Sequence, residues 1–557
     1  MNRVLRNNKG IALFIALMLT LMLSIIGLGI IKSSNDEVSI AGNELNEMKC
    51  FYVAEAGLDK VTSLIQSQYD TNELPPTIAP AETTSIDGIA LAYSTVPQAS
   101  AQKTLTKGSL AGLKAFVRPY KIQSTAYDSS HNTSVVLEEW FEVASVPIFQ
   151  FAVFYDNDLE IAPGAHMDVT GRVHSNGDLY VQSEAGTGID FDSYITAYGS
   201  IYHGRKPGSG LSTATGDVNI KNIDGTYMSM RQGSGWLDAA DSYWYDTAAA
   251  RWGGRVQDNS FGQERLTLPL ENPDDPHTLI DRYDDGSGTY NNSSMELDAT
   301  LKIIDGVALY NVSGTTWIDV TSTLTTSGAL LETTFYDKRE EQNATVYDID
   351  VAKLSTSGYF PSNGIVYTAD DRTGFRATRL YNATDIGAPF TLASENPVYT
   401  KGNINTTDKQ PMAIMCDAIT VLSGNWSDAP AKAASADKTQ RPATSTTINF
   451  SYITGNKNTG SSVYNGGLEN LPRFLENWST RTLTYRGSIV NMWLSEKTSG
   501  IWSGAYYNPP SRDWEFDTDL NDISNLPPGT PAVRAFIRWG WKQTNVGYTV
   551  ATMNPET

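Results

Sequence analysis

The sequence predicts a mainly β protein with a long N-terminal α-helix, followed by a small antiparallel sheet and a right-handed β-helix, or β-solenoid. Three observations predict this fold class. The chain opens with a long apolar stretch, two alternating segments follow, and the remainder repeats short apolar strands between Gly, Asn and Asp. Its many glycines and small polar residues suit strands and turns better than packed helices.

The chain is long enough for several folded units. It has 557 residues, of which 40% are apolar and 18% charged, whereas a single hydrophobic core usually stops growing at about 250–300 residues. The formal net charge of -21 and the pI near 4.7 argue against a nucleic-acid partner, because neutralising phosphates requires a face of Lys and Arg. We therefore expect two or three units and no binding of nucleic acid.

Cysteine is scarce in this sequence. Cys50 and Cys416 are the two cysteines of the chain, so neither a disulfide framework nor a four-thiolate zinc site can form. In an oxidising compartment these two thiols could pair with each other. One disulfide and two free thiols are the open alternatives.

The N-terminal segment predicts a membrane anchor. Arg3, Arg6 and Lys9 precede an uncharged run from Ile11 to Ile31, and about 20 apolar residues suffice for a helix to cross a bilayer. The basic flank places the N-terminus in the cytoplasm and the remainder of the chain outside. A cleaved secretory signal would have a shorter apolar core and a small-x-small site, so we expect a single-pass anchor.

The helix should continue beyond this anchor. From Ser33 to Tyr69 there is no proline, and apolar residues recur at steps of three and four, as in an amphipathic helix. This stripe consists of Val38, Ala41, Leu45, Met48, Tyr52, Leu58, Val61 and Ile65. A helix over residues 11–69 would be roughly 90 Å long, so its outer half must pack on its own domain or on neighbouring subunits.

Three segments carry a family resemblance. They are a basic leader that ends in KG, the run IALFIALMLTLMLSIIGLGI and the later FYVAEAGLDKV. In this order they resemble PilX-type type IV pilus minor pilins. The resemblance implies cleavage by prepilin peptidase between Gly10 and Ile11, followed by N-methylation of Ile11. Gly10 suits this role, because a residue without Cβ lets a protease approach the backbone closely.

Ile15 departs from the usual pattern of pilins. Most pilins carry Glu five residues into the mature chain, where Ile15 stands here. In a filament that carboxylate can offset a neighbour's buried N-terminal amine, and an unpaired buried charge is costly. The absence of this Glu resembles both PilX-type proteins and the tip pseudopilin of type II secretion. We therefore expect a rare, terminal subunit.

The strand patterns follow the helix. LKAFVRPYKIQSTAY and TSVVLEEWFEVASV alternate partly across a polar SSHN turn, as an antiparallel pair does. Beyond them, short alternations such as Met167-Asp168-Val169 are separated by Gly164, Gly171 and Gly177. Short strands broken in this way are typical of a β-solenoid.

Longer strings in the same region resemble the large uncharacterised C-terminal domain often fused to PilX-type N-termini. They are GRVHSNGDLYV, GGLENLPRFLENW, TLTYRGSIVNMW, YYNPPSRDWEFD and LPPGTP. The expected domains are a prepilin leader at 1–10, the transmembrane and assembly helix at 11–70, a linker at 71–84, a small pilin-like antiparallel sheet at 85–148, the extracytoplasmic β-solenoid at 149–535 and a C-terminal tail at 536–557.

Six of the twelve tryptophans gather near the C-terminus. They are Trp478, Trp493, Trp502, Trp514, Trp539 and Trp541. If exposed, these side chains could form a surface that binds sugars or a partner. We favour the alternative, in which they are buried in the core.

The sequence contains no motif that predicts catalysis. Its five histidines show no HExxH or comparable ligand spacing, which argues against a zinc enzyme, and we expect His166 and His174 to be turn residues. Neither a Gly-x-Ser-x-Gly elbow nor a phosphate-binding Gly-Lys-Ser/Thr loop occurs. We expect no catalytic and no cofactor-binding residues.

Calcium is the one ion that the sequence suggests. The densest acidic stretch, NPDDPHTLIDRYDDGSGTYNN, contains Asp281, Asp284, Asp285 and Asn291, which offer oxygen ligands of the kind calcium takes. Their spacing does not fit an EF-hand loop. We favour a solvated loop and expect no metal ligands.

These observations together predict a minor pilin-like structural subunit and not an enzyme. The subunit would prime or cap a type IV pilus and present its large domain at the tip for adhesion or partner docking. By resemblance, its partners are other minor and major pilins, prepilin peptidase, the pilus assembly platform and a large calcium-dependent pilus adhesin. It would cross the inner membrane once, with an extracytoplasmic C-terminal domain, and then enter the cell-surface pilus.

Two alternatives stay open. The first is a tip subunit of a type II secretion pseudopilus, which shares the leader and the missing Glu. The second is a tethered polysaccharide-degrading enzyme on the β-helix. Such an enzyme needs paired carboxylates or a calcium ion with Arg or Lys in a groove, and no spacing in the chain singles out such a set.

Overall fold

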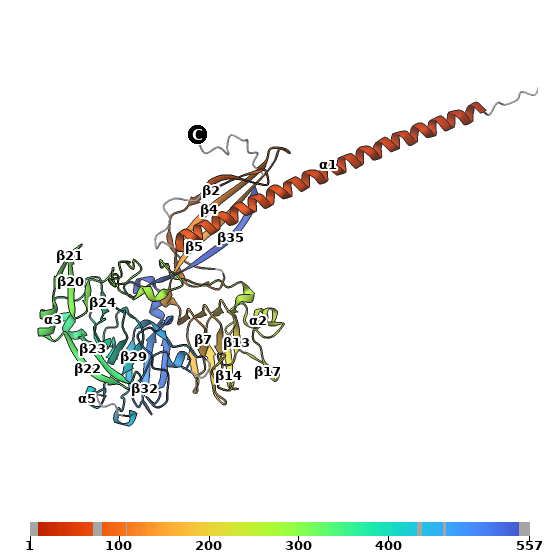
Figure 1. Ribbon diagram of the computed structural model, residues 1–557. Coiled ribbons are helices and arrows are strands. Elements are labelled where there is room, and N and C mark those ends of the chain that lie inside the picture. Colours follow the sequence, from red (N-terminus) through yellow and green to blue (C-terminus); the bar gives the residue numbers. More distant parts are fainter. Residues whose placement is uncertain (1–8, 71–80, 107, 432–436, 461–463, 545–557) are drawn as a thin grey trace, which may run out of the picture.

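A single long helix dominates the N-terminal part of the molecule (Figure 1). The computed structural model describes residues 9–70, 81–106, 108–431, 437–460 and 464–544. Helix α1, Lys9–Asp70, is continuous. In Figure 1 its N-terminal half extends away from the molecule, while its C-terminal half lies along a sheet. The prediction of one uninterrupted helix is confirmed.

This first sheet has six antiparallel strands, in the order β1–β2–β4–β5–β35, with β3 also paired to β4. The strand bounds are β1 Glu82–Ile86, β2 Ile89–Pro97, β3 Ala101–Thr104, β4 Lys114–Asp128, β5 Thr133–Pro147 and β35 Ala532–Thr544. β4 and β5 pair along their length, from Phe116 with Ser145 to Asp128 with Thr133. The two segments predicted as an antiparallel pair are therefore partners.

The last strand of the first sheet comes from the opposite end of the chain. β35 pairs with β5 from Ala532 with Pro147 to Thr544 with Val136. Residues 148–531 are thus inserted between two adjacent strands of one sheet. The predicted C-terminal tail at 536–557 needs correction, because residues 536–544 belong to β35. Their partner strand lies far away in the sequence, so no local pattern revealed the pairing.

The inserted domain is built mainly from parallel strands. Its longest sheet has twelve strands in the order β18–β12–β9–β6–β33–β31–β28–β26–β24–β19–β20–β21. The bounds are β18 Val256–Gln257, β12 Ile195–Ala197, β9 Val173–Ser175, β6 Val153–Tyr155, β33 Ile489–Leu494, β31 Ser451–Asn456, β28 Met412–Cys416, β26 Phe390–Ser394, β24 Ile365–Ala369, β19 Leu301–Ile304, β20 Val307–Ser313 and β21 Thr316–Asp319. Its pairs are parallel except for β19 with β20 and β20 with β21.

A second long sheet has eight strands in the order β22–β23–β25–β27–β30–β32–β34, with β29 also paired to β27. The bounds are β22 Leu330–Asp337, β23 Gln342–Asp350, β25 Phe375–Ala383, β27 Val398–Ile404, β29 Ile419–Leu422, β30 Thr446–Asn449, β32 Thr482–Gly487 and β34 Ser511–Phe516. β22 and β23 are antiparallel, and the other pairs are parallel.

Shorter elements complete the inserted domain. Two small sheets have the orders β13–β10–β7 and β15–β14–β11–β8, and β16 pairs with β17. The bounds are β7 Leu159–Ile161, β8 Met167–Val169, β10 Leu179–Val181, β11 Gly188–Phe191, β13 Ile201–His203, β14 Asp217–Lys221, β15 Tyr227–Ser229, β16 Arg231–Gln232 and β17 Gly235–Trp236. The helices are α2 Trp244–Trp252, α3 Thr321–Ser327, α4 Val351–Thr356 and α5 Asp428–Ala431. The 3₁₀ turns are η1 Ile148–Gln150, η2 Asn259–Phe261, η3 Pro276–Leu279, η4 Lys438–Gln440, η5 Leu468–Asn470, η6 Thr518–Asn521 and η7 Ile523–Asn525.

Successive strands of one sheet come from successive turns of the chain. Val153 pairs with Val173, which pairs with Ile195. In the neighbouring small sheet, Leu159 pairs with Leu179 in the same manner. Each turn therefore stacks on the previous one and extends a ladder of buried apolar side chains. A mainly β protein with a long N-terminal helix is confirmed; the right-handed β-helix is not confirmed by these pairings and stays a prediction.

Two stretches of chain meet in the middle of the twelve-stranded sheet. From β6 the chain stacks through β9 and β12 to β18, and it then crosses to the other end of the sheet. From there it returns through β24, β26, β28 and β31 to β33, which pairs with β6 through Ile489 and Val153. Residues 258–300, which make this crossing, are called the crossing segment below.

The twelve-stranded sheet is buried on both faces. All five residues of β28 are buried, with Ile414 in one hydrophobic core and Met415 in a second. Leu268 and Ile280 of the crossing segment belong to the second core. Parallel strands covered on both faces have nearly continuous apolar sequences, which explains runs such as MAIMC.

Candidate assembly interface and neighbouring sites

The N-terminal half of α1 presents an exposed apolar surface. Every Leu, Ile, Met and Phe from Ile11 to Ile31 is exposed, and Ile15 has an exposed fraction of 52%. Among the described residues, α1 is the one helix long and apolar enough to cross a membrane. An apolar surface of this extent indicates contact with lipid or with other proteins, so this half of α1 is the candidate assembly interface.

The C-terminal half of α1 packs on the first sheet. The buried apolar side chains of this half share a core with residues of β2, β4 and β5; they are Cys50, Val53, Ala54, Leu58, Val61, Ile65 and Tyr69. The hydroxyls of Tyr69 and Tyr120 are 2.8 Å apart and hydrogen-bonded. Arg538 of β35 donates a hydrogen bond of 2.8 Å to Asp59. These contacts fix the helix to β4, which follows it in the chain, and to β35, which is the last strand that the structure describes.

The predicted apolar stripe of α1 therefore divides into two parts. Leu58, Val61 and Ile65 are buried on the sheet, whereas Val38 and Tyr52 are exposed by 71% and 61%. The sequence left open whether the stripe packs on its own domain or on other subunits. The structure assigns the end of the stripe to the domain and leaves its beginning uncovered.

Gly57 lets α1 come close to the sheet. A Cβ at this position would overlap Ser124 Oγ and lie 2.8 Å from Leu91 Cδ1. Other glycines of α1, Gly10, Gly27, Gly29 and Gly42, have no neighbouring atom within 4 Å of such a Cβ. The AEAG segment served in the sequence as a mark of resemblance, and its glycine has a packing role that we did not predict. The position of Gly57 between the apolar residues Val53, Leu58 and Val61 is the signal that could have indicated it.

The predicted processing site lies where α1 begins. Gly10 and Ile11 are in the first turn of the helix, and both are exposed. Residues 1–8 of the predicted leader lie outside the described residues. Cleavage after Gly10 and methylation of Ile11 stay predictions.

Residues 9–59 match the family model described as PilX N-terminal. The N-terminal segment of this chain is therefore similar to that of PilX-type proteins. No curated protein matches the chain. Among solved structures, it is similar to the competence-associated pilin ComZ from Thermus thermophilus, at 10% identity and a TM-score of 0.28, over 89% of this chain and 97% of that one.

The two thiols of the chain, Cys50 and Cys416, are free. Cys50 lies in the core beneath α1, with its Sγ 3.6 Å from Thr133 O. Cys416 lies in the core of the inserted domain, with its Sγ 3.8 Å from Thr454 Oγ1. The possible disulfide is therefore corrected to two free thiols, because a bond requires Cα atoms within about 7 Å and these cysteines belong to separate cores. Burial raises the pKa of both thiols, which makes them unreactive.

His174 is not the turn residue that we expected. It lies in β9 and is 2% exposed. Its Nδ1 is 2.8 Å from Thr196 Oγ1 and its Nε2 is 3.0 Å from Asn176 Oδ1. Burial lowers the pKa of His174 to about 4, so the ring is neutral at pH 7 and acts in the structure as a hydrogen-bonding core residue.

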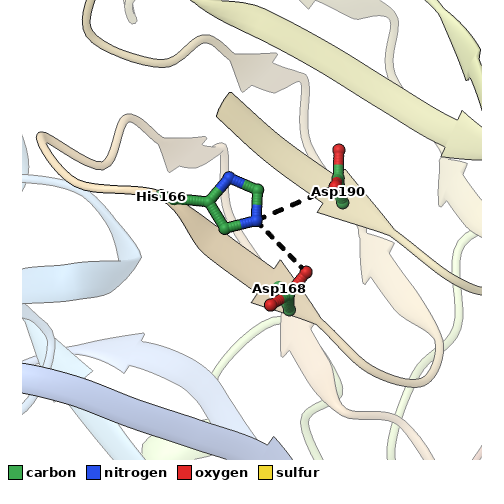
Figure 2. A group of neighbouring side chains, drawn as sticks. All are labelled: His166, Asp168 and Asp190. Carbon is green, nitrogen blue, oxygen red and sulfur yellow. Dashed lines mark ion pairs between the residues drawn. The ribbon is translucent and has the colours of Figure 1, made fainter. Parts of the chain in front are cut away.

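His166 faces two aspartates from adjacent strands (Figure 2). Asp168 of β8 and Asp190 of β11 are direct partners in a parallel ladder. The Nε2 of His166 lies 3.4 Å from Asp168 Oδ1 and 3.8 Å from Asp190 Oδ2, and Figure 2 shows these contacts as dashed lines. These atom types and spacings could hold a metal ion. No sequence motif indicated this group, because Asp190 comes from another turn of the chain than His166 and Asp168.

The predicted calcium ligands have other partners in the structure. Asp284 and Asp285 each accept a hydrogen bond from a backbone N–H two residues ahead, and Asn291 donates to Thr278 O. In the part of the chain that the structure describes, Asp281 gathers instead with His277 and Glu496. The expectation of a solvated loop without metal ligands stays a prediction.

The C-terminal tryptophans have two different environments. Trp478, Trp493 and Trp514 are buried, as we favoured. Trp539 and Trp541 lie on β35 and are exposed by 43% and 54%. Trp502 is half-buried and lies outside the strands. Trp539 and Trp541 both lie in the outer part of β35, where every residue from Arg538 to Gln543 is exposed.

Proposed function

We propose that this chain is a minor, non-enzymatic subunit that primes or caps a type IV pilus and presents its large domain at the tip for adhesion or partner docking. The observation that carries the proposal is the division of α1. Its apolar half, from Ile11 to Ile31, contacts nothing else in the described chain, while its other half is packed on the first sheet. Such a helix can leave the lipid and join a bundle of similar helices without disturbing the folded domain.

A terminal position is supported by Ile15 and by the size of the insertion. A subunit with Ile15 has no carboxylate at that position to offset a neighbour's amine in the filament. The inserted residues 148–531 lie at the end of α1 opposite its exposed half (Figure 1). A domain of that size would hinder the close packing of subunits along a shaft, and it would be accommodated at a tip.

The partners and location follow from this role. Prepilin peptidase would process the chain in the inner membrane, and the assembly platform would pass it to other minor and major pilins. The extracytoplasmic domain would then dock a large calcium-dependent adhesin or a surface. Its stacked parallel turns would form the right-handed β-helix predicted from the sequence.

Mass spectrometry of the mature N-terminus tests the proposal. The purified native protein should begin with a methylated Ile11, and a Gly10→Val variant should keep its first ten residues. A wild-type protein that retains these residues would contradict the proposal. Deletion of the chain distinguishes a type IV pilus from a type II secretion pseudopilus. Loss of surface pili in electron micrographs supports a pilus subunit, whereas loss of protein secretion with intact pili supports a pseudopilus subunit.

A further inference from the structure

The inserted domain has a seam where two sheets end beside each other. β34 is the last strand of the eight-stranded sheet and β8 is the last strand of a small sheet. The two strands are in contact but belong to no common ladder. At one end of the seam, Phe516 N donates a hydrogen bond of 2.8 Å to Thr170 Oγ1. This end is therefore closed.

A pocket opens along the rest of the seam. Its volume is about 680 Å³, and its two sides are residues 162–168 and 509–515. Glu469, Asn470, Trp502, Gly504 and Tyr507 complete its lining. Pockets of this size accommodate small ligands, which such sites hold with a few well-placed polar groups.

Three polar atoms in the lining lack partners. Glu469 is 4% exposed, and its Oε1 accepts a hydrogen bond of 2.7 Å from Ala162 N. Its Oε2 has no hydrogen-bond partner among the described residues, and the same holds for Trp514 Nε1 and Arg512 Nε. Buried polar atoms are normally paired, so one acceptor and two donors are left unpaired just beneath the surface of the pocket.

An aromatic ring stands beside these polar atoms. Trp502 is half-buried, and its Nε1 donates a hydrogen bond of 2.8 Å to Tyr507 Oη. Tyr507 in turn donates to Asn470 Oδ1 at 2.6 Å. This chain of hydrogen bonds fixes the ring, which leaves an apolar surface of defined orientation at the pocket.

We propose that this pocket binds a neutral saccharide. Hydroxyl groups both donate and accept hydrogen bonds, so a small shift of the Glu469, Arg512 or Trp514 side chain would let a sugar pair with these atoms. The apolar face of the sugar would pack on the Trp502 ring. The pocket lining contains the carboxylates of Asp168, Asp513 and Glu515. Arg512 is the one Arg or Lys among its lining residues. This excess of carboxylates disfavours an anionic sugar.

A peptide strand fits the seam less well. Adding a strand requires a continuous edge of backbone N–H and C=O groups, but Pro509 and Pro510 remove two N–H groups from one side. The hydrogen bond between Phe516 and Thr170 closes the far end. The geometry therefore favours a compact ligand.

Calorimetry on the full-length protein tests this inference. The protein is held in an amine-oxide detergent, which has no sugar headgroup, and is titrated with neutral hexasaccharides of glucose, galactose, mannose and N-acetylglucosamine. We expect at least one to bind. Trp502→Ala and Glu469→Gln should each weaken binding at least tenfold, and Trp541→Ala, an exposed tryptophan on the first sheet, should leave it unchanged.

Three results would overturn the inference. The first is that none of the four sugars binds. The second is that a sugar binds Trp502→Ala as tightly as it binds the wild type. The third is that a neutral peptide library binds, no sugar binds, and Trp502→Ala abolishes the binding of the peptides. If Glu469→Gln does not fold, Trp502→Ala decides the matter, because its ring is only half-buried. The biological role of saccharide binding rests on the proposed function. Binding is measured on purified protein and piliation is measured in cells, so the saccharide inference and the proposed function can fail separately.

Discussion

His277 and Asp417 join the crossing segment to the twelve-stranded sheet. The Nε2 of His277 lies 3.4 Å from Asp417 Oδ1, and the side chains are 2% and 0% exposed. Nδ1 of the same ring is 2.7 Å from Asp281 Oδ1. Asp417 also accepts hydrogen bonds from the backbone N–H groups of Glu496 and Lys497. One buried imidazole thus connects three separate parts of the chain.

This relationship predicts that stability falls as the pH rises. Burial lowers the pKa of His277, but hydrogen bonds to Asp281 and Asp417 outweigh burial and raise it to about 10. The unfolded chain has a His pKa of about 6.5. Because the folded state holds the proton more tightly, the stabilisation is complete below about pH 6.5 and is lost as the pH rises through about 10.

Urea unfolding measured between pH 6 and 10 checks this dependence. His277→Gln should lower the free energy of unfolding at pH 6 by about 3 kcal/mol, because it leaves the buried carboxylate of Asp417 without its cationic partner. The variant should also lose the part of the pH dependence that His277 causes. An equally steep pH profile in the variant would show that another group is responsible.

Gly57 and Gly42 provide a matched pair for testing how α1 packs. Gly57→Ala should destabilise the protein by about 1–3 kcal/mol, because the new Cβ meets Ser124 and Leu91 in a full core. Gly42→Ala should stabilise the helix by up to about 1 kcal/mol, because alanine is a better helix former and the site is open. Thermal unfolding of both variants gives the comparison. Equal effects would mean that the helix does not approach the sheet as described.

Two truncations test the position of β35. A chain that ends at residue 531 loses the strand that covers β5, including Val533 and Ala535 of the second core. Its first sheet should become sensitive to proteolysis. A chain that ends at Thr544 keeps all of β35 and should resist the protease as the wild type does. Equal resistance of both truncated chains would contradict the insertion of the large domain within the first sheet.

The two cysteines should behave as buried, unpaired thiols. Intact-mass measurement after maleimide treatment should show little reaction of the folded protein and two additions in urea, because burial raises the pKa of Cys50 and Cys416. Reductant should not change the result. A mass two units lower, with no maleimide added in urea until reductant is present, would instead indicate a disulfide.

Much of this architecture was accessible from local patterns. The uninterrupted apolar run and the three- and four-residue spacing after it predicted α1, because a helix is specified by neighbours in the sequence. The partial alternation on either side of SSHN predicted β4 and β5 for the same reason. The short strands of the inserted domain were visible as a repeat, although their order within the sheets was not.

The candidate sites were less accessible because their residues come together from distant positions. His277 meets Asp417 across the boundary between the crossing segment and a sheet, and His166 meets Asp190 from the next turn of the chain. The saccharide pocket combines Glu469 with Trp514 and with residues 162–168. Single-sequence reasoning detects ligand sets with local spacing, as in HExxH, and has no means of detecting these.

By itself, the sequence determined the basic leader, the apolar anchor, the continuous helix and the alternating strands, because each depends on residues within a few positions of one another. The tertiary structure alone decided that β35 closes the first sheet on β5, that β33 stacks on β6, and that polar groups converge at the seam. These arrangements depend on which of several strands, far apart in the chain, covers a given apolar surface and pairs with a given strand edge. The packing of the whole domain determines that pairing, so it cannot be predicted from the pattern of neighbouring residues in the sequence.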